Sequence, residues 1–97
     1  MTTLRHADFA HRVGDEFTVD WSGTMHTLVL EAVDEPHRAD GIVSFGITLR
    51  GDASVPAEQG TRSFTAVGFN TTELFIVPVG RDEHGVRFHA AFSVQEG

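Results

Sequence analysis

The chain has 97 residues, which is enough for one domain and too few for two hydrophobic cores. Hydrophobic residues make up 40% of it, the proportion of an ordinary globular protein, and this excludes an intrinsically disordered chain. Fourteen acidic residues against seven arginines give a net charge of −7, so the surface repels phosphate backbones and we expect no nucleic-acid partner.

The first element that the sequence predicts is a short helix within residues 1–14. Thr3 can cap its start, Phe9 and Val13 lie four residues apart and share one face, and Gly14 can end it. A helix of two turns at most is not stable alone. We therefore expect this segment to pack on the rest of the domain.

The remainder of the chain favours β-strands, because Val, Ile and Phe together number 22 against seven for Leu and Met. In the first half, Phe17–Trp21 alternates, and Ser22–Gly23 turns the chain into a second strand over Met25–Val33. A polar loop over Asp34–Gly41 leads to a third strand, Val43–Leu49, in which apolar residues alternate clearly.

The second half begins with a long polar connection from Gly51 to Gly60 and then a fourth strand from Phe64 to Gly68, with a turn at Asn70–Thr72. The fifth strand covers Glu73–Val79, where Pro78 predicts a sheet edge or a bulge because proline cannot donate to the ladder. The last strand runs from Val86 to Gln95. Short turns leave no room for helical crossovers, so we expect antiparallel pairing.

These elements predict a mainly β fold in one domain over residues 1–97. Six antiparallel strands can close into a small barrel or split into a sandwich, with the N-terminal helix, residues 1–14, packing on the sheet. We favour the barrel. Its own phenylalanines would fill an interior of this size and leave little room for a ligand.

Candidate metal-binding groups do not converge in the sequence. His6, Asp8 and His11 could supply ligands, but a spacing of five puts the two histidines on different sides of a helix. His84 and His89 have Asp82 and Glu83 nearby, but charged residues on a loop are typical of a solvated surface. We predict no metal and no cofactor.

Catalytic groups are equally scattered. His26 could act as a general base with Asp34 and Glu35 as carboxylates, but adjacent acids beside a proline are typical of a solubilising loop. None of the serines lies in a Gly-x-Ser-x-Gly context, and the absence of cysteine excludes thiolate nucleophiles and disulfides. We therefore predict that the protein is not an enzyme.

Membrane and secretion signals are missing as well. The longest uncharged apolar stretch, Leu74–Gly80, is far shorter than the roughly 20 residues that span a bilayer. The N-terminus has no basic leader followed by an apolar run. We expect no membrane partner and assume a cytoplasmic location by default.

The fifth strand offers the clearest interaction surface, because it is apolar on both faces. Leu74 and Ile76 can fill the core, whereas the opposite face needs a cover, which the N-terminal segment or another subunit can provide. A tryptophan at the end of the first strand can join this surface or fill a core position at the barrel rim. The expected interaction surface consists of Phe75, Val77, Pro78 and Trp21.

Several blocks along the chain carry a family resemblance. They are Leu4, His6, Asp8-Phe9, Val13-Gly14 and Phe17; Phe45 with Leu49-Arg50-Gly51; Gln59-Gly60-Thr61; Glu73 to Gly80; and Phe88, Ala90 and Phe92. On these residues nearly the whole chain resembles a bacterial family of mostly β domains of about this length without an assigned function. Members accompany phage-tail-like or collar-fibre proteins, so the resemblance implies a role in assembly and no catalytic residues. Arg62-Ser63 stands where the family has an aromatic residue, which leaves the register of the fourth strand open.

The function predicted from these observations is a non-enzymatic structural or protein-interaction module. It would associate with itself as a homo-oligomer or join another protein in a phage-tail-like or extracellular fibre assembly. If the last strand is unpaired, it can add to a neighbour's sheet. The alternative is a β-barrel that binds a small ligand or a carbohydrate, which would require a cavity.

Overall fold

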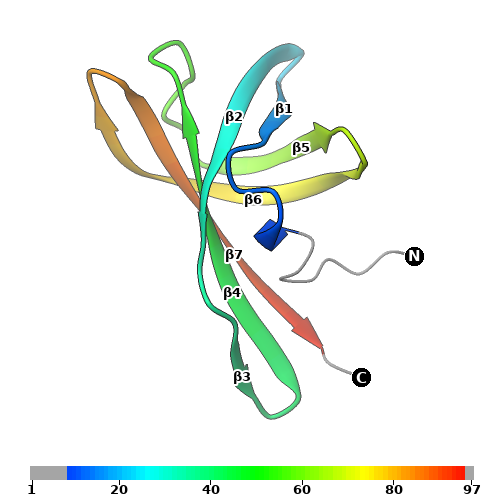
Figure 1. Cartoon of the computed structure of the whole chain (residues 1–97). Helices are drawn as coiled ribbons and strands as arrows, with labels where there is room; N and C mark the ends of the chain where they lie inside the picture. Colours follow the sequence, from blue (N-terminus) through cyan, green and yellow to red (C-terminus); the bar gives the residue numbers. More distant parts are fainter. Residues whose placement is uncertain (1–8, 96–97) are drawn as a thin grey trace.

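A computed structural model describes residues 9–95 of the chain, which form an antiparallel β fold (Figure 1). The strands are β1 (Glu16–Trp21), β2 (Thr24–Val33), β3 (His37–Ala39), β4 (Ile42–Gly51), β5 (Gly60–Ala66), β6 (Phe69–Asp82) and β7 (Gly85–Gln95). No helix within these described residues is long and apolar enough to cross a membrane.

Six of the strands form a closed barrel. They neighbour one another in the order β2-β1-β5-β6-β7-β4, and pairing of β2 with β4 closes the ring. This confirms the mainly β fold and decides between barrel and sandwich. The strand β3 pairs with β4 outside the ring. Figure 1 shows β4 and β7 running side by side away from the barrel, which lengthens the molecule to 40 × 25 × 22 Å.

Alternation along the strands places the apolar residues inside the barrel. In β1, for example, Phe17, Val19 and Trp21 are buried while the residues between them are exposed, as the sequence predicts. Among the described residues the core contains no buried polar or charged side chain. The buried core residues are Phe9, Phe17, Val19, Trp21, Leu28, Leu30, Phe45, Ile47, Leu49, Val55, Phe64, Leu74, Ile76, Val86, Phe88 and Ala90.

The predicted turn between the first two strands is confirmed at Ser22–Gly23. Both residues have positive φ, 53° and 93°, which is the backbone of a tight type I′ hairpin turn. The Gly23 N–H donates to Asp20 Oδ1 at 2.8 Å and holds this turn.

The prediction of a continuous loop over Asp34–Gly41 was wrong, because His37–Ala39 forms the strand β3. Asp40 and Gly41 have φ values of 51° and 76°, so they make a second two-residue turn of the same kind and pair β3 with the start of β4. The polar composition of this segment conceals the strand, whereas its Asp-Gly dipeptide is a known hairpin signal.

The turn between β5 and β6 also differs from the prediction. It lies at Val67–Gly68, and Asn70 is already inside β6. Gly68 adopts a φ of 74° without the steric cost of a Cβ, which explains why the chain turns at the glycine. The register of β5 is settled too, because Arg62 lies opposite Leu74 and Phe64 opposite Thr72.

The N-terminal helix is not supported by the part of the chain that the structure describes. Thr3, its predicted cap, lies outside the described residues; Phe9 and Ala10 are helical, and a turn follows at once. The Gly14 N–H donates to the Leu30 carbonyl at 2.7 Å, and the Leu30 N–H donates to Asp15. Within the described residues, the backbone therefore leaves the helical path by Gly14, where it pairs with β2.

Candidate functional site

The four predicted surface residues fall on two sides of the barrel wall. Phe75 is 53% exposed, and Val77, which is half-buried, faces outward with it on β6. Pro78 lies opposite buried Phe88 and thus faces inward. Trp21 is only 6% exposed and belongs to the core cluster. The structure thus brings Phe75 and Val77 together on one face and separates them from the other two.

A β-bulge beside Pro78 adds another apolar side chain to the outside of β6. The register jumps from Pro78–Phe88 to Gly80–Arg87, so Val79 is an extra residue without a partner on β7. Its side chain is 60% exposed. Proline cannot donate to the ladder, which accounts for the irregularity at this point and confirms the predicted bulge.

The last strand has a free edge over Ala90–Gln95, which we call the β7 edge. On one side β7 pairs with β4 from Val86 to Gln95. On the other side its pairing with β6 ends at His89–Val77, and no strand within residues 9–95 continues the ladder there. Figure 1 shows the reason: β6 sweeps away from β7 to join β5.

The β7 edge lacks the features that normally prevent edge-to-edge pairing. Its six residues, Ala-Ala-Phe-Ser-Val-Gln, contain no charge and no proline. By comparison, the free side of β6 over Val77–Asp82 carries Pro78, the bulge and two charged residues, and β3 has three residues including Arg38. The β7 edge is therefore a more suitable template for another strand.

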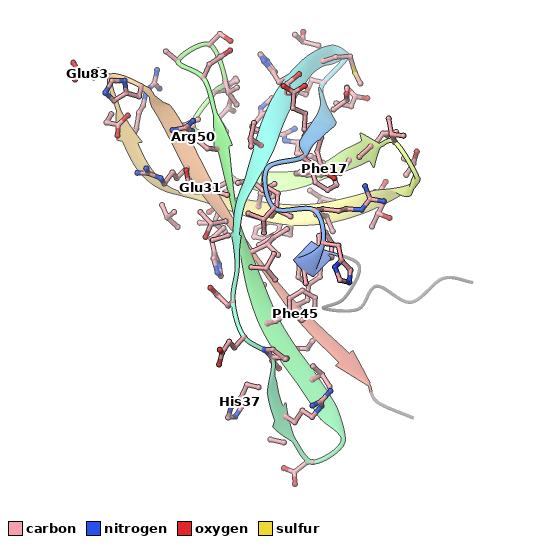
Figure 2. All side chains as sticks on the ribbon, in the orientation of Figure 1. Phe17, Glu31, His37, Phe45, Arg50 and Glu83 are labelled. Carbon is pink, nitrogen blue, oxygen red and sulfur yellow. The ribbon has the colours of Figure 1, made fainter. Side chains whose placement is uncertain are left out.

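The outer face of the barrel carries a charged cluster beside these elements. Arg50 of β4 and Arg87 of β7 lie opposite each other, where like charges repel. Glu31 is the extra residue of a bulge in β2. It accepts a 2.9 Å hydrogen bond from Arg87 Nε, and its other oxygen lies 3.7 Å from Arg50 Nε. Figure 2 shows Glu31 and Arg50 on this outer side.

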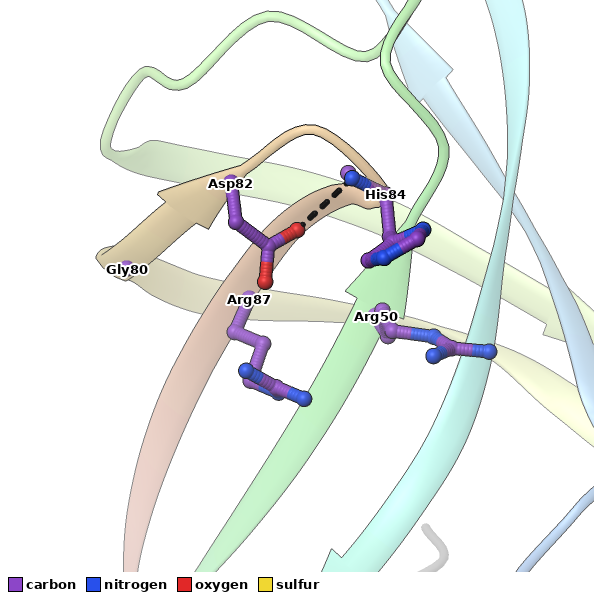
Figure 3. A pocket seen from close by; sticks show the side chains of 6 residues that line it. Arg50, Gly80, Asp82, His84 and Arg87 are labelled. Atoms are coloured by element: carbon purple, nitrogen blue, oxygen red, sulfur yellow. Dashed lines mark hydrogen bonds between the residues drawn. The ribbon is translucent and has the colours of Figure 1, made fainter.

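A depression of about 50 Å³ adjoins this cluster, lined by Arg50, Gly80, Asp82, His84, Gly85 and Arg87 (Figure 3). The His84 backbone N–H donates to Asp82 Oδ1 at 2.8 Å, and this bond lowers the pKa of Asp82, with smaller contributions from the charges of His84 and Arg87. The depression is far smaller than a typical ligand pocket, which measures several hundred Å³. Asp82 within the depression and Glu31 beside it offset the charges of Arg50 and Arg87, so its shape and charge favour no bound substrate.

The histidines that the sequence singled out lie apart from one another. His89 Nε2 is 3.6 Å from Asp34 Oδ2 on the exposed outer face, and His84 Nε2 is 3.6 Å from Glu83 on a turn. His26 packs edge-on against Trp21 instead of meeting Asp34 or Glu35.

No three His, Asp or Glu side chains gather around a possible metal position in the part of the chain that the structure describes. Of the predicted N-terminal ligands, His6 and Asp8 lie outside the described residues, and His11 is exposed. No acid–base pair is enclosed in a cleft among the groups described above.

Sequence reasoning anticipated one feature of the barrel in part and missed another. The first is the β7 edge: the sequence allowed for an unpaired last strand, but which part of it is free follows only from the point where β6 and β7 diverge. The second is the inward direction of Arg62, which follows from the register of β5. A signal for it was available, because Phe64 predicts an inward face and Arg62 lies two residues before it on the same side.

Comparison with known proteins identifies one family. The profile of a family described as a domain of unknown function, DUF6916, matches residues 4–92 of the chain. No curated protein and no solved structure matches it.

Proposed function

This chain belongs to the DUF6916 family, and we propose that it is a non-enzymatic protein-interaction module that self-associates through the β7 edge. The observation that carries the proposal is the free, uncharged ladder side of Ala90–Gln95. Unpaired N–H and C=O groups on such an edge add to a neighbouring strand by main-chain hydrogen bonds.

A second copy of the same chain is the partner that this edge fits. A two-fold axis perpendicular to the sheet pairs two β7 strands antiparallel and places residues of the same face opposite each other. Such a pair is centred on Phe92 or on Ser93. This pairing joins the β3-β4-β7 part of one copy to the same part of the other in a continuous sheet. Because Ala90–Gln95 contains no charged residue, no like charges face each other across the contact.

The apolar outer face of β6 borders the β7 edge and supports the same proposal. The edge begins immediately after His89, the residue opposite Val77. Exposed Phe75 and Val79 on β6 add apolar area beside this point. Large exposed apolar side chains on neighbouring positions are a feature of protein–protein contacts.

The setting that we propose is a larger protein assembly of the phage-tail-like or fibre type. It rests on the family resemblance described above and on the elongated shape of the domain. A ligand-binding barrel is less well supported, because phenylalanine and aliphatic side chains occupy the interior and no polar residue among those described is buried there.

A lysine on the β7 edge tests the proposal. Ala91 is exposed on the outer face, so Ala91→Lys leaves the core intact and places a charge beside the free ladder. Light scattering over a concentration series should give a defined oligomer for the natural chain and a monomer for Ala91→Lys. The matched control is Ala39→Lys on the edge of β3, which should keep the oligomer.

A cysteine in the same edge reports the contact directly, since the chain has none of its own. Ser93→Cys should form a covalent dimer under mild oxidation, whereas Ala39→Cys should not. If the natural chain is monomeric at every concentration, or if Ala91→Lys and Ala39→Lys behave alike, self-association through this edge is wrong.

A further inference from the structure

Arg62 is a charged side chain on the inner side of the barrel wall. It lies opposite buried Leu74 in the β5–β6 register, and Phe64 on the same face fills the core. Arginine is rare in such a position unless a carboxylate pairs with it. Among the described residues, the ion pairs of arginines involve Arg12, Arg50 and Arg87, and none involves Arg62.

The Arg62 guanidinium is held at one end of the barrel between an indole ring and a glycine. Its Cζ lies 4.5 Å from the centre of the Trp21 ring, a cation–π contact. On another side, a Cβ at Gly60 would be only 3.3 Å from Arg62 Nη2. The missing side chain of Gly60 therefore leaves the space that the guanidinium uses.

Two hydrogen-bond donors in this pair have no acceptor. Trp21 Nε1 and Arg62 Nε are buried, and neither has a hydrogen-bond partner in the described structure. An indole nitrogen and a guanidinium nitrogen only donate, so the two groups cannot satisfy each other. Buried donors without an acceptor are rare in folded proteins and call for a bound water, ion or ligand.

The groups around this pair leave the charge of Arg62 uncompensated. His26 packs its ring edge-on against Trp21, with 5.8 Å between the ring centres, and an imidazole supplies no negative charge. The carboxylate of Asp52 accepts hydrogen bonds from the backbone N–H and hydroxyl of Ser54, and among the described residues no ion pair joins it to Arg62. What the site lacks is thus an acceptor that carries negative charge.

We propose that this end of the barrel binds an oxyanion, a carboxylate or a phosphate, with Arg62 as the cation and Trp21 Nε1 as a second donor. A guanidinium offers several N–H groups in one plane to the oxygens of such an anion. Arg62 is only half-buried. Its side chain moves off the indole to meet the anion, and this movement exposes both donors. The site is separate from the β7 edge and does not depend on self-association.

The single tryptophan makes this proposal directly testable, because the chain has one Trp and no Tyr. Acetate and inorganic phosphate are titrated separately at constant ionic strength, with chloride as the balancing salt. The indole N–H resonance of Trp21 should shift and saturate with at least one of the two anions, and Trp21 fluorescence should change with the same midpoint. The anion that binds more tightly assigns the class of ligand.

Variants of Arg62 separate binding from ordinary salt effects. Arg62→Gln should abolish the saturable shift, and Arg62→Lys, which keeps the charge but loses the planar donors, should weaken binding at least about tenfold. Arg87→Gln on the outer face is the matched control and should bind as the natural chain does. A natural chain that responds to acetate and phosphate only as it responds to chloride, or an unchanged response in folded Arg62→Lys, would overturn the proposal.

Discussion

At the scale of single residues, close backbone approaches decide which glycines the barrel requires. A Cβ on Gly85 would lie 1.9 Å from the carbonyl oxygen of Gly51, and the φ of Gly85 is 143°. A backbone atom cannot give way as the end of a side chain can. At Gly80, five residues earlier, an added Cβ would have no atom within 4 Å.

We therefore expect Gly85→Ala to lower the free energy of unfolding by about 3 kcal/mol, because it combines backbone strain with a steric clash. Gly80→Ala is the matched control and should change it by less than about 1 kcal/mol. Urea unfolding of both variants gives the comparison. Equal effects would mean that the two chain segments at the turn are not in contact.

At the scale of the elements, Phe9 is the one buried side chain of residues 9–15, the described segment before β1. Phe9 is fully buried, with its ring 6.0 Å from Phe45 and 5.2 Å from Phe92. Figure 2 shows Phe45 directed toward this segment from β4. Val13, which a helix would place on the same face as Phe9, is 53% exposed.

Phe9→Ala should destabilise the domain by about 3–5 kcal/mol, because it leaves a cavity beside the rings of Phe45 and Phe92. This is a large part of the 5–15 kcal/mol that typically stabilises a domain. Val13→Ala should cost no more than about 0.5 kcal/mol. Thermal unfolding monitored by circular dichroism measures the stability of both variants. If both lose stability to a similar extent, Phe9 and Val13 share one packed face, as the predicted helix requires.

The strands and their inward residues could be predicted because alternation has a period of two and depends only on local sequence. The conformation of the segment before β1 could not be predicted in this way, because Gly14 and Asp15 form backbone hydrogen bonds with Leu30, which is distant in the sequence. The strand β3 is stabilised by β4 and not by its own composition. The β-propensity of a segment does not indicate which distant strand it will pair with.

The candidate sites were harder to predict for the same reason. Phe75 does lie on an exposed face, as the two-sided apolar pattern of its strand indicates. The β7 edge, however, exists because β6 pairs with β5 up to Ile76 and with β7 only from Val77 onward, which no feature of the last strand encodes. Trp21 and Arg62 meet because β1 pairs with β5, a strand more than 40 residues further along the chain, and neither strand encodes this pairing by itself.

At the scale of the whole molecule, two aspartates make the free energy of unfolding depend on pH. The hydroxyl and backbone N–H of Ser54 lower the pKa of Asp52, and the backbone N–H of His84 lowers that of Asp82. Asp52 directly follows β4, and Asp82 is the last residue of β6, so both carboxylates lie where a strand passes into a turn. A carboxyl group whose pKa is lower in the folded than in the unfolded protein stabilises the fold only while it is ionised.

Their contribution is complete above the ordinary aspartate pKa of 3.8 and is lost as the pH falls through the lower values of the folded state. The double variant Asp52→Asn, Asp82→Asn should therefore lose less stability than the natural chain between neutral pH and pH values below 3.8. Urea midpoints across this range measure the difference. Parallel pH profiles would show that the two hydrogen-bonded turns do not contribute.

The place of β7 in the ring also determines when the protein can fold. This strand lies between β4 and β6, yet it is synthesised after both of them. While the ribosome is still making Gly85 to Gln95, the nascent chain has two strands without their shared neighbour, and the ring stays open. Such unpaired strands are prone to pair with other chains. Barrel closure is thus delayed until the last strand has emerged, and that interval is when the chain most needs protection from aggregation.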